Sequence, residues 1–268
     1  MAINVNSNSS SFYGSVPKTF DSASARLSSG QRINSAKDDA AGLAISNRIS
    51  TQIGGYSTAI RNAGDGVSYA QTAGGALDSL NSNVQRIREL SVQASNGSLN
   101  DQDRKGIQQE ISQLQDESRN ILEKSNFNGS KLFSGENSKT FQVGPNQGDT
   151  VAVSNSDLKK TLEDSGIFSI NVSTQAGASS GLDKLDSALE SISSTAAEYG
   201  SVANRFESAI NNLTVSRENA QASKSRVSDA DFAEESSNLV KGRIQDQVGI
   251  AVRSQANARQ QDVLRLLS

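Results

Sequence analysis

The chain has no cysteine, no histidine and no tryptophan among its 268 residues. Without histidine and cysteine it cannot build a Ser-His-Asp triad, a thiol nucleophile or the common zinc sites. The adjacent carboxylates Asp38-Asp39 and Glu234-Glu235 are poor acid-base pairs, because neighbouring residues on a helix point about 100° apart. Asp101-Gln102-Asp103 lacks the remaining ligands of a calcium loop. We therefore expect no catalytic residue, no cofactor and no metal, and a protein that is not an enzyme.

Apolar and aromatic residues are also scarce, at 34% and 4% of the chain. Even with its 21 glycines counted as apolar, the chain stays below the ~45–50% that is typical of globular proteins, so we expect no thick multilayer core. No apolar run approaches the ~18 residues that a membrane span needs, and no secretory signal peptide is readable. The net charge of −3 gives no indication of nucleic-acid binding. We expect neither a nucleic acid nor a membrane as a partner.

Helix-breaking residues are rare, since the only prolines are Pro17 and Pro145. Between residues 182 and 213, apolar residues alternate steps of three and four without a break. This spacing predicts a coiled-coil helix of about five heptads, roughly 47 Å long. The residues expected to form the core of this coiled coil are Leu182, Leu185, Leu189, Ile192, Tyr199, Phe206, Ile210 and Leu213.

The N-terminal half offers partners for this helix. Apolar residues repeat at the same spacing over 45–70 and again over 77–90, with Gly74-Gly75 as a plausible weak point between them. A further helical segment is expected over 107–122. Two helices from the N-terminal side and one from the C-terminal side can then share one narrow apolar seam.

Two helix starts carry recognisable signals. Asn100 or Asp101 is a candidate N-cap, directly after the turn-like Asn96-Gly97-Ser98. Further upstream, Ser35 followed three residues later by Asp38 is typical of a capping-box-like helix start.

The period of the pattern changes in the middle of the chain. Residues 140–143 and 150–153 alternate like strands and predict a β-hairpin with a longer turn. Residues 125–181 are rich in Ser, Asn and Gly, and we expect them to be the least helical part. Within them, residues 167–172 are a candidate for another short strand.

Both ends of the chain differ from the segments with regular apolar spacing. Residues 1–25 are rich in Ser and Asn, whereas the last stretch is an amphipathic helix whose pattern is interrupted by charges. We expect neither end to be well ordered alone, because an unburied apolar stripe needs a partner, and that partner can be another copy of the chain. The interrupting charges are Arg243, Asp246, Arg253 and Arg259.

Several motifs occur together and in order. In the N-terminal half they are RLSSGQRINSAKDDAAGLAI from Arg26 to Ile45, NAGDG from Asn62 to Gly66, QRIRELSVQ from Gln85 to Gln93 and NGSKL from Asn128 to Leu132. In the C-terminal half they are Asn204-Arg205-Phe206, Asn211-Asn212-Leu213, SDADFA from Ser228 to Ala233, Gln255-Ala256-Asn257 and VLRLL from Val263 to Leu267. With these motifs the chain resembles bacterial flagellin, in a short form with a minimal variable middle region.

The resemblance implies a mainly α fold: a long antiparallel coiled-coil helical rod with a small β-hairpin region and no large outer domains. It implies a secreted structural subunit that polymerises into the extracellular flagellar filament used for swimming. The implied segments are 1–40 and 226–268 as the two parts of an inner-tube coiled coil, 41–125 as N-terminal rod helices, 126–181 as β-hairpin and variable region, and 182–225 as C-terminal rod helix.

The resemblance also implies partners: other copies of the chain, flagellar junction and cap proteins, and an export chaperone of the flagellar type III apparatus. Contacts between subunits are assigned to Leu239, Val240, Ile244, Val248, Leu264 and Leu267. Flagellins are ligands of a host Toll-like receptor, and the positions that match its contact residues are Arg86, Leu90, Gln93 and Glu110.

Other functions stay open at this level. A hook–filament junction protein or another axial filament protein shares terminal heptads, but the short middle and the full N-terminal motif count against it. A helical chemoreceptor-type signalling module would need a helical tip where residues 140–153 have a strand pattern. A carboxylate-based hydrolase would need a pocket-forming aromatic core, which the composition disfavours.

Overall fold

The structure is a computed structural model that describes residues 16–135, 138–155 and 157–267. The Ser- and Asn-rich start of the chain, residues 1–15, lies outside the described residues. Our expectation for residues 1–25 can therefore be compared with the structure only from residue 16 onward.

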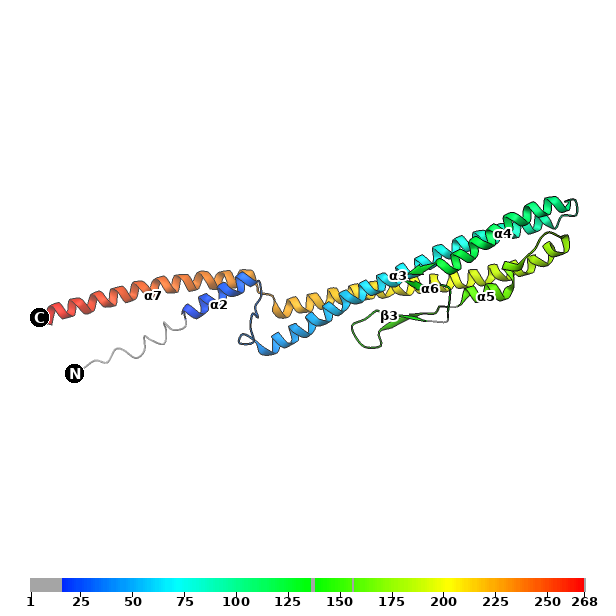
Figure 1. The fold of residues 1–268 in the computed structure, drawn as a ribbon. Coiled ribbons are helices and arrows are strands. Elements are labelled where there is room, and N and C mark those ends of the chain that lie inside the picture. The colour runs from blue at the N-terminus through cyan, green and yellow to red at the C-terminus, as the bar shows by residue number, and fades with distance from the viewer. Residues whose placement is uncertain (1–15, 136–137, 156, 268) are drawn as a thin grey trace. The chain divides into compact units, whose positions relative to one another are not determined.

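The chain divides into two compact units. The first unit consists of residues 1–53 and 218–268, and the second of residues 54–217. The two longest helices, α3 (Ala40–Ala94) and α6 (Gln175–Ser228), each belong partly to one unit and partly to the other. Figure 1 labels these helices along the chain.

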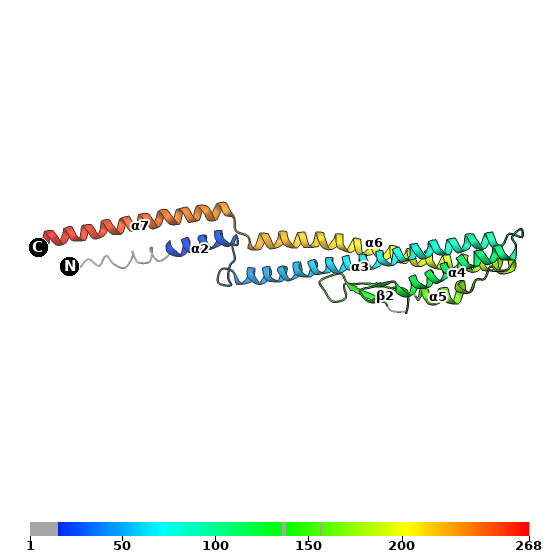
Figure 2. The same ribbon diagram turned by 45° about the horizontal axis from the view of Figure 1, so that its top comes forward.

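In the second unit, α3 and α6 lie side by side with α4 (Asp101–Lys124), as Figures 1 and 2 show. The shorter α5 (Leu158–Ser165) and the 3-10 helix η1 (Ile167–Ser169) pack against this helical group. Along α3 the fully buried positions follow the three-and-four spacing that the sequence predicts. They include Ala73, Leu77, Leu80, Val84 and Ile87.

The expected weak point at Gly74-Gly75 is wrong, since α3 continues through both glycines. A glycine inside a helix costs about 1 kcal/mol relative to alanine. Here the flanking side chains of Ala73 and Leu77 are each 0% exposed in the core. Their burial stabilises the helix by more than the two glycines destabilise it.

One of the two expected helix starts is confirmed. Asn100 caps α4 in a capping box, in which its side chain accepts from the N–H of Asp103 at 2.8 Å. The start expected at Ser35 and Asp38 is wrong, because Asp38 accepts from the Ser35 hydroxyl at 3.0 Å within a turn. Helix α3 begins after Asp39, whose carboxylate accepts from the N–H of Gly42 at 2.8 Å.

The predicted hairpin is confirmed to within one residue as β3 (Lys139–Gln142) and β4 (Thr150–Val153), which pair antiparallel. The sequence pattern missed a smaller hairpin of β1 (Asn126–Phe127) and β2 (Ser130–Lys131). Its two-residue turn is Asn128-Gly129, with φ angles of 49° and 76°, the left-handed conformation that Asn and Gly tolerate best.

An aromatic cluster joins the hairpins to the helices of the second unit. The ring of Tyr69 lies 5.6 Å from that of Phe127 and 5.8 Å from that of Phe141, measured between centroids. Phe141 in turn meets Phe206 edge-on at 5.3 Å. Burial raises the pKa of Tyr199, whose hydroxyl donates to the Leu132 carbonyl at 3.2 Å. The few aromatic residues of the chain are thus concentrated where strands meet helices.

The strand proposed over 167–172 is wrong. Residues Ile167–Ser169 form η1, and two amide side chains of α4 bind the backbone that a partner strand would have bound. Gln115 Nε2 donates to the carbonyl of Ile167 at 2.8 Å, and Gln108 Oε1 accepts from the N–H of Val172 at 2.6 Å. Apolar residues in this segment face the core, which mimics the pattern of a buried strand.

In the first unit, α2 (Val16–Ser29) packs along α7 (Phe232–Leu267). The segments that lead into these helices also bind each other. The N–H of Arg32 donates to the Ser228 carbonyl at 2.7 Å, and the N–H of Ala230 donates to the Gly30 carbonyl at 3.0 Å. Main-chain hydrogen bonds therefore join the segments next to α2 and α7.

Candidate functional site

The face of α7 that packs against α2 carries two glycines and a glutamate that forms an ion pair. Glu235, Gly242 and Gly249 are buried at a spacing of seven residues. A Cβ atom at Gly242 would lie 3.4 Å from the Cβ of Phe20, in ordinary van der Waals contact, so the two helices pack directly against each other here. Glu235 accepts from Arg26 Nη1 at 2.9 Å, which pairs a nearly buried carboxylate.

A second, uncovered face of α7 is apolar. Val240, Ile244 and Val248 follow each other four residues apart and are 53%, 55% and 55% exposed. At about 100° per residue, this row lies on the side of the helix opposite Gly242. We call these three residues the α7 row. Because α2 covers the other face, the α7 row has no partner among the described residues of the chain.

The remaining predicted subunit contacts are placed differently. Leu239 is half-buried, and Leu264 and Leu267 lie in α7 with side chains outside the described residues. The prediction missed three more exposed apolar residues of α7, of which Val252 continues the four-residue spacing of the α7 row and Ile250 does not. These are Phe232, Ile250 and Val252, exposed by 72%, 63% and 47%. The four-residue spacing itself could have identified Val252, whereas the signal for Ile250 is an apolar residue at an off-period position of an amphipathic helix.

One of the charges expected to interrupt the helix contributes to the packing of α2. The Arg243 guanidinium lies 5.9 Å from the centroid of the Phe20 ring, in cation–π geometry. Its neighbour Asp246 is exposed and lies away from the α7 row by the same helix arithmetic. These two charges flank the apolar row without interrupting it.

In α6 the predicted core row lies partly beside the buried seam. Leu185, Ile192, Tyr199, Phe206 and Leu213 are buried, whereas Leu182, Leu189 and Ile210 are half-buried. The seam is completed by small residues one position earlier in the heptad, namely Gly181, Ala188 and Thr195. Small side chains here let the neighbouring backbones approach, and the leucines cover the flank.

The four positions assigned to receptor contact do not all reach the surface. Arg86 Nη2 donates to Glu110 Oε1 at 2.8 Å, which confirms that these residues of α3 and α4 lie side by side. Gln93 is exposed about two turns further along α3 from Arg86. Leu90 is 3% exposed and belongs to the hydrophobic core, so it is no part of the exposed patch. Arg86 and Leu90 lie one turn apart on α3, but only Arg86 reaches the surface.

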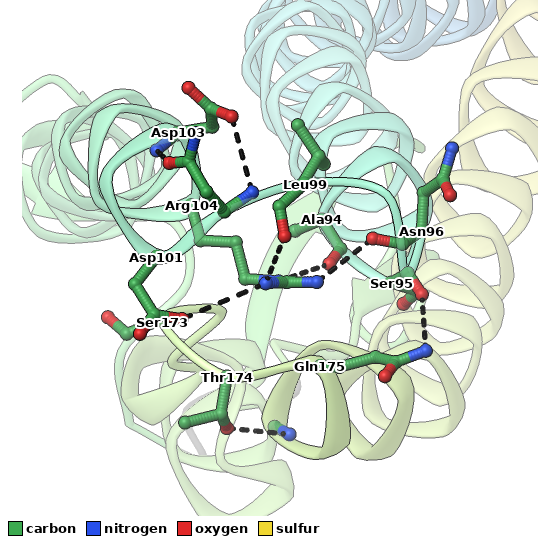
Figure 3. Close-up of polar contacts among 12 residues, drawn as sticks. Ala94, Ser95, Asn96, Leu99, Asp101, Asp103, Arg104, Ser173, Thr174 and Gln175 are labelled. Atoms are coloured by element: carbon green, nitrogen blue, oxygen red, sulfur yellow. Dashed lines mark hydrogen bonds and ion pairs between the residues drawn. The ribbon is translucent and has the colours of Figure 1, made fainter.

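The end of α3 beyond this patch is held by Arg104, whose side chain is 8% exposed. Its guanidinium donates to the carbonyls of Ala94 at 3.0 Å, Leu99 at 2.7 Å and Asn96 at 2.9 Å (Figure 3). Gln175, at the start of α6, donates to the carbonyl of Ser95 at 3.0 Å. One buried cation and one amide thus satisfy the carbonyls that end α3.

Two exposed ion pairs link helices of the second unit. Arg88 Nε donates to Asp186 Oδ1 at 2.6 Å, and this hydrogen bond lowers the pKa of the Asp186 carboxyl. Lys159 Nζ donates to Glu123 Oε1 at 2.9 Å and likewise lowers the pKa of Glu123. Both pairs stabilise the charged form of their carboxylate.

The described residues contain open grooves but no cluster of side chains that could hold a metal ion. Two open grooves between β4 and α6 share Ala197, Ser201 and Arg205, and are lined mainly by small residues. Within residues 16–135, 138–155 and 157–267, no three carboxylates lie together where they could hold a metal ion. None of the helices described here has the length and apolarity that crossing a membrane requires.

Comparisons with known proteins agree along most of the chain. Residues 3–138 match the family model of the bacterial flagellin N-terminal helical region, and residues 182–267 match that of the bacterial flagellin C-terminal helical region. A flagellin from Halalkalibacterium halodurans is 38% identical over 243 residues, which cover 90% of this chain and 89% of the relative. Flagellin C from Vibrio cholerae is 31% identical over 376 residues and covers 100% of both chains.

Solved structures show the same fold. The crystal structure of Bacillus cereus flagellin has a TM-score of 0.52 at 31% identity, and covers 57% of this chain and 88% of that chain. A putative flagellar hook-associated protein from Vibrio parahaemolyticus also has a TM-score of 0.52, covering 72% of this chain and 97% of that one. At 19% identity, this second likeness concerns the fold alone.

Long heptad helices, a small β region and an uncovered apolar helix face define a self-assembling structural protein of the α-helical class. The two family models and the flagellin relatives specify the class further. The chain belongs to the bacterial flagellin family and is a structural subunit of the flagellar filament, an extracellular appendage.

Proposed function

We propose that the chain polymerises through the α7 row and that the resulting filament serves swimming motility. The observation that carries this proposal is the placement of Val240, Ile244 and Val248 on the face of α7 opposite α2. A neighbouring copy that covers this row removes about half of each side chain from water. At ~1.5–3 kcal/mol for a fully buried aliphatic side chain, each residue contributes roughly 1 kcal/mol per subunit contact. Repetition along the polymer makes such contacts cooperative.

One substitution tests the row. Ile244→Glu places a charge in the proposed contact, and burial of an unpaired carboxylate strongly opposes assembly. Gln245→Glu is the matched control, because it adds the same charge to an exposed position about 100° away. We expect the Ile244 variant to remain helical by circular dichroism and to form no filaments by electron microscopy, whereas the Gln245 variant polymerises. Normal filaments from the Ile244 variant would refute the assignment.

A truncation tests the wider segment. Deletion of residues 240–268 removes the α7 row together with Leu264 and Leu267. We expect a soluble, mostly helical monomer that does not polymerise, measured by analytical ultracentrifugation. Filaments formed by this truncation would contradict the role of the C-terminal segment.

The finer partners and the route to the outside of the cell belong to the same proposal. We infer export through the flagellar type III apparatus with the help of a chaperone, and contacts with junction and cap proteins at the filament ends. The family membership and the segments 1–40 and 226–268, assigned to the inner-tube coiled coil, support this inference. Co-purification of the chain with its export chaperone from the native cytoplasm tests it.

Recognition by a host Toll-like receptor is proposed for the exposed residues Arg86, Gln93 and Glu110. Their position on adjoining helices supports one continuous polar patch. In a receptor reporter-cell assay, Arg86→Ala should reduce signalling strongly, and unchanged signalling would contradict this surface. A hook–filament junction role is the alternative function, and electron microscopy of the purified chain separates the two, since only a filament subunit forms long polymers alone.

A further inference from the structure

We propose that Asn96-Gly97, in the turn between α3 and α4, is a self-modifying site. The backbone nitrogen of Gly97 attacks the side-chain amide of Asn96, and the product is an isoaspartate that Arg104 binds. The site lies on the turn after α3, apart from the α7 row, and includes none of Arg86, Gln93 and Glu110. It rests on three hydrogen bonds that converge on the reacting groups.

The reaction needs only the chain and water. A bond forms between Gly97 N and Asn96 Cγ while the Cγ–Nδ2 bond breaks, and the proton lost by Gly97 N leaves with the amide as ammonia. The resulting five-membered succinimide is then opened by one water molecule. Attack at Cγ gives aspartate, and attack at the former main-chain carbonyl carbon gives isoaspartate.

The nucleophile is activated through its own peptide group. The carbonyl oxygen of Asn96, which belongs to the same peptide as Gly97 N–H, accepts from Arg104 Nη2 at 2.9 Å and from Leu99 N at 3.3 Å. When Gly97 N loses its proton, negative charge moves onto this oxygen. Two donors, one of them a cation, therefore stabilise the anion in the manner of an oxyanion hole.

The electrophile is activated as well. The N–H of Ser98 donates to Asn96 Oδ1 at 3.1 Å, which polarises the Cγ–Oδ1 bond and holds the side chain along the turn. Asn96, Gly97 and Ser98 are all exposed, so that water and base can reach them. The residue after Asn96 is a glycine, whose lack of a side chain removes the main steric obstacle to ring closure.

Arg104 is positioned before the reaction begins. Its guanidinium also donates to the Ala94 and Leu99 carbonyls, at 3.0 and 2.7 Å, so it is fixed at both edges (Figure 3). In isoaspartate the former Asn96 carbonyl carbon becomes a free carboxylate. The hydrogen bond from Arg104 then becomes an ion pair, so Arg104 favours the water attack that produces isoaspartate and stabilises that product.

The chain contains a natural reference site. Asn128-Gly129 has the same dipeptide sequence, but it occupies the tight turn of the β1–β2 hairpin with Asn128 at φ 49°. Near this turn, Lys139 donates to the Ser130 hydroxyl and Asn155 donates to the Lys131 carbonyl, so the described side-chain donors bind the residues that follow the turn. The two sites therefore share their intrinsic chemistry and differ in the surrounding structure.

The experiment follows both sites in the full-length chain. Purified protein is incubated at mildly alkaline pH, and peptides are sampled over days by mass spectrometry with electron-transfer fragmentation, which distinguishes isoaspartate from aspartate. The same time course is run in guanidinium chloride, where the folded surroundings are lost. The variants are Arg104→Gln and, as a matched control for loss of a positive charge, Lys105→Gln at the neighbouring exposed position.

We expect Asn96 to convert about ten-fold faster in the folded chain than in denaturant, in keeping with one charge-assisted hydrogen bond to the developing anion. Asn128 should convert no faster when folded. Arg104→Gln should lower both the Asn96 rate and its isoaspartate share to the denatured values, whereas Lys105→Gln should change neither. A folded Asn96 rate at or below the denatured rate overturns the proposal. So does an Arg104→Gln variant that keeps the native rate, or that reacts faster because its turn has loosened.

Discussion

The packing of α3 against α6 depends on the missing side chain of Gly66. A Cβ atom built at this position would meet the Phe206 ring, at 2.6 Å from Cε1 and 2.7 Å from Cε2, well inside van der Waals contact. Phe206 is 0% exposed, so its ring has no free space to enter. By contrast, a Cβ at Gly64, one half-turn earlier on the same helix, would have no neighbour within 4 Å.

The two glycines therefore predict opposite effects of the same substitution. Replacing a helical glycine with alanine stabilises by about 1 kcal/mol through helix propensity. Gly64→Ala should show this gain in full. Gly66→Ala should add an overpacking cost of ~1–3 kcal/mol, which leaves a net loss of about 1 kcal/mol. The difference between the two variants is then about 2 kcal/mol in the free energy of unfolding.

Urea denaturation of the monomeric chain measures this difference. Tyrosine fluorescence is a suitable signal, because Tyr69 and Tyr199 lie in the same aromatic cluster and the chain has no tryptophan. In a Phe206→Leu background, the smaller side chain should make room, and Gly66→Ala should become stabilising like Gly64→Ala. A Gly66→Ala variant that is as stable as Gly64→Ala in the native background would refute the close-packing argument.

Two other perturbations give further tests. Hydrogen bonding lowers the pKa of Asp186 and of Glu123 in the folded chain, so their stabilisation is complete above their unfolded pKa values and is lost as the pH falls through the lower folded values. The thermal midpoint of unfolding should therefore drop between about pH 5 and pH 3. This drop should be less steep in Asp186→Asn than in the control Asp183→Asn. Equal slopes in the two variants would contradict the role of the Arg88–Asp186 pair. Tyr199→Phe removes the hydroxyl that donates to the Leu132 carbonyl and lies 3.1 Å from Asn155 Oδ1. It should lower the free energy of unfolding, measured by urea denaturation, by about 1–2 kcal/mol. The control Tyr56→Phe, at a half-buried position, should lower it by less than half as much.

Periodicity predicted the helices well where large apolar side chains line the seam. Leu185, Ile192 and Phe206 have the expected spacing and are buried. The same reasoning missed Gly181 and Ala188, because hydropathy gives little weight to small residues even where close helix contact requires them. A pattern of apolar residues marks which side of a helix is inside, but the exact centre of the seam depends on which side chains are small.

The segments whose backbone is bound by side chains from other elements were the hardest to predict from the sequence. The backbone of Ile167 and Val172 is bound by Gln115 and Gln108 from α4, distant in sequence, and no local pattern indicates such partners. Arg104 was not singled out for a similar reason, since a buried arginine that binds three carbonyls looks like any surface charge in the sequence. By contrast, the four-residue spacing of the α7 row is local, so the row can be read from the sequence alone.

The pairing of α2 with α7 has a consequence for the order in which the protein takes shape. Arg26 and Glu235 are 209 residues apart, and the bridge between Gln31 and Asp229 spans almost as much of the chain. Contacts of this sequence separation carry a large loop-closure cost and form late. Helix α2 therefore packs only once α7 is present, and a copy that ends before Glu235 leaves α2 without the helix face that carries Glu235, Gly242 and Arg243. The α2–α7 pair therefore forms only in a chain that extends at least through Arg243, long after α2 itself has been synthesised.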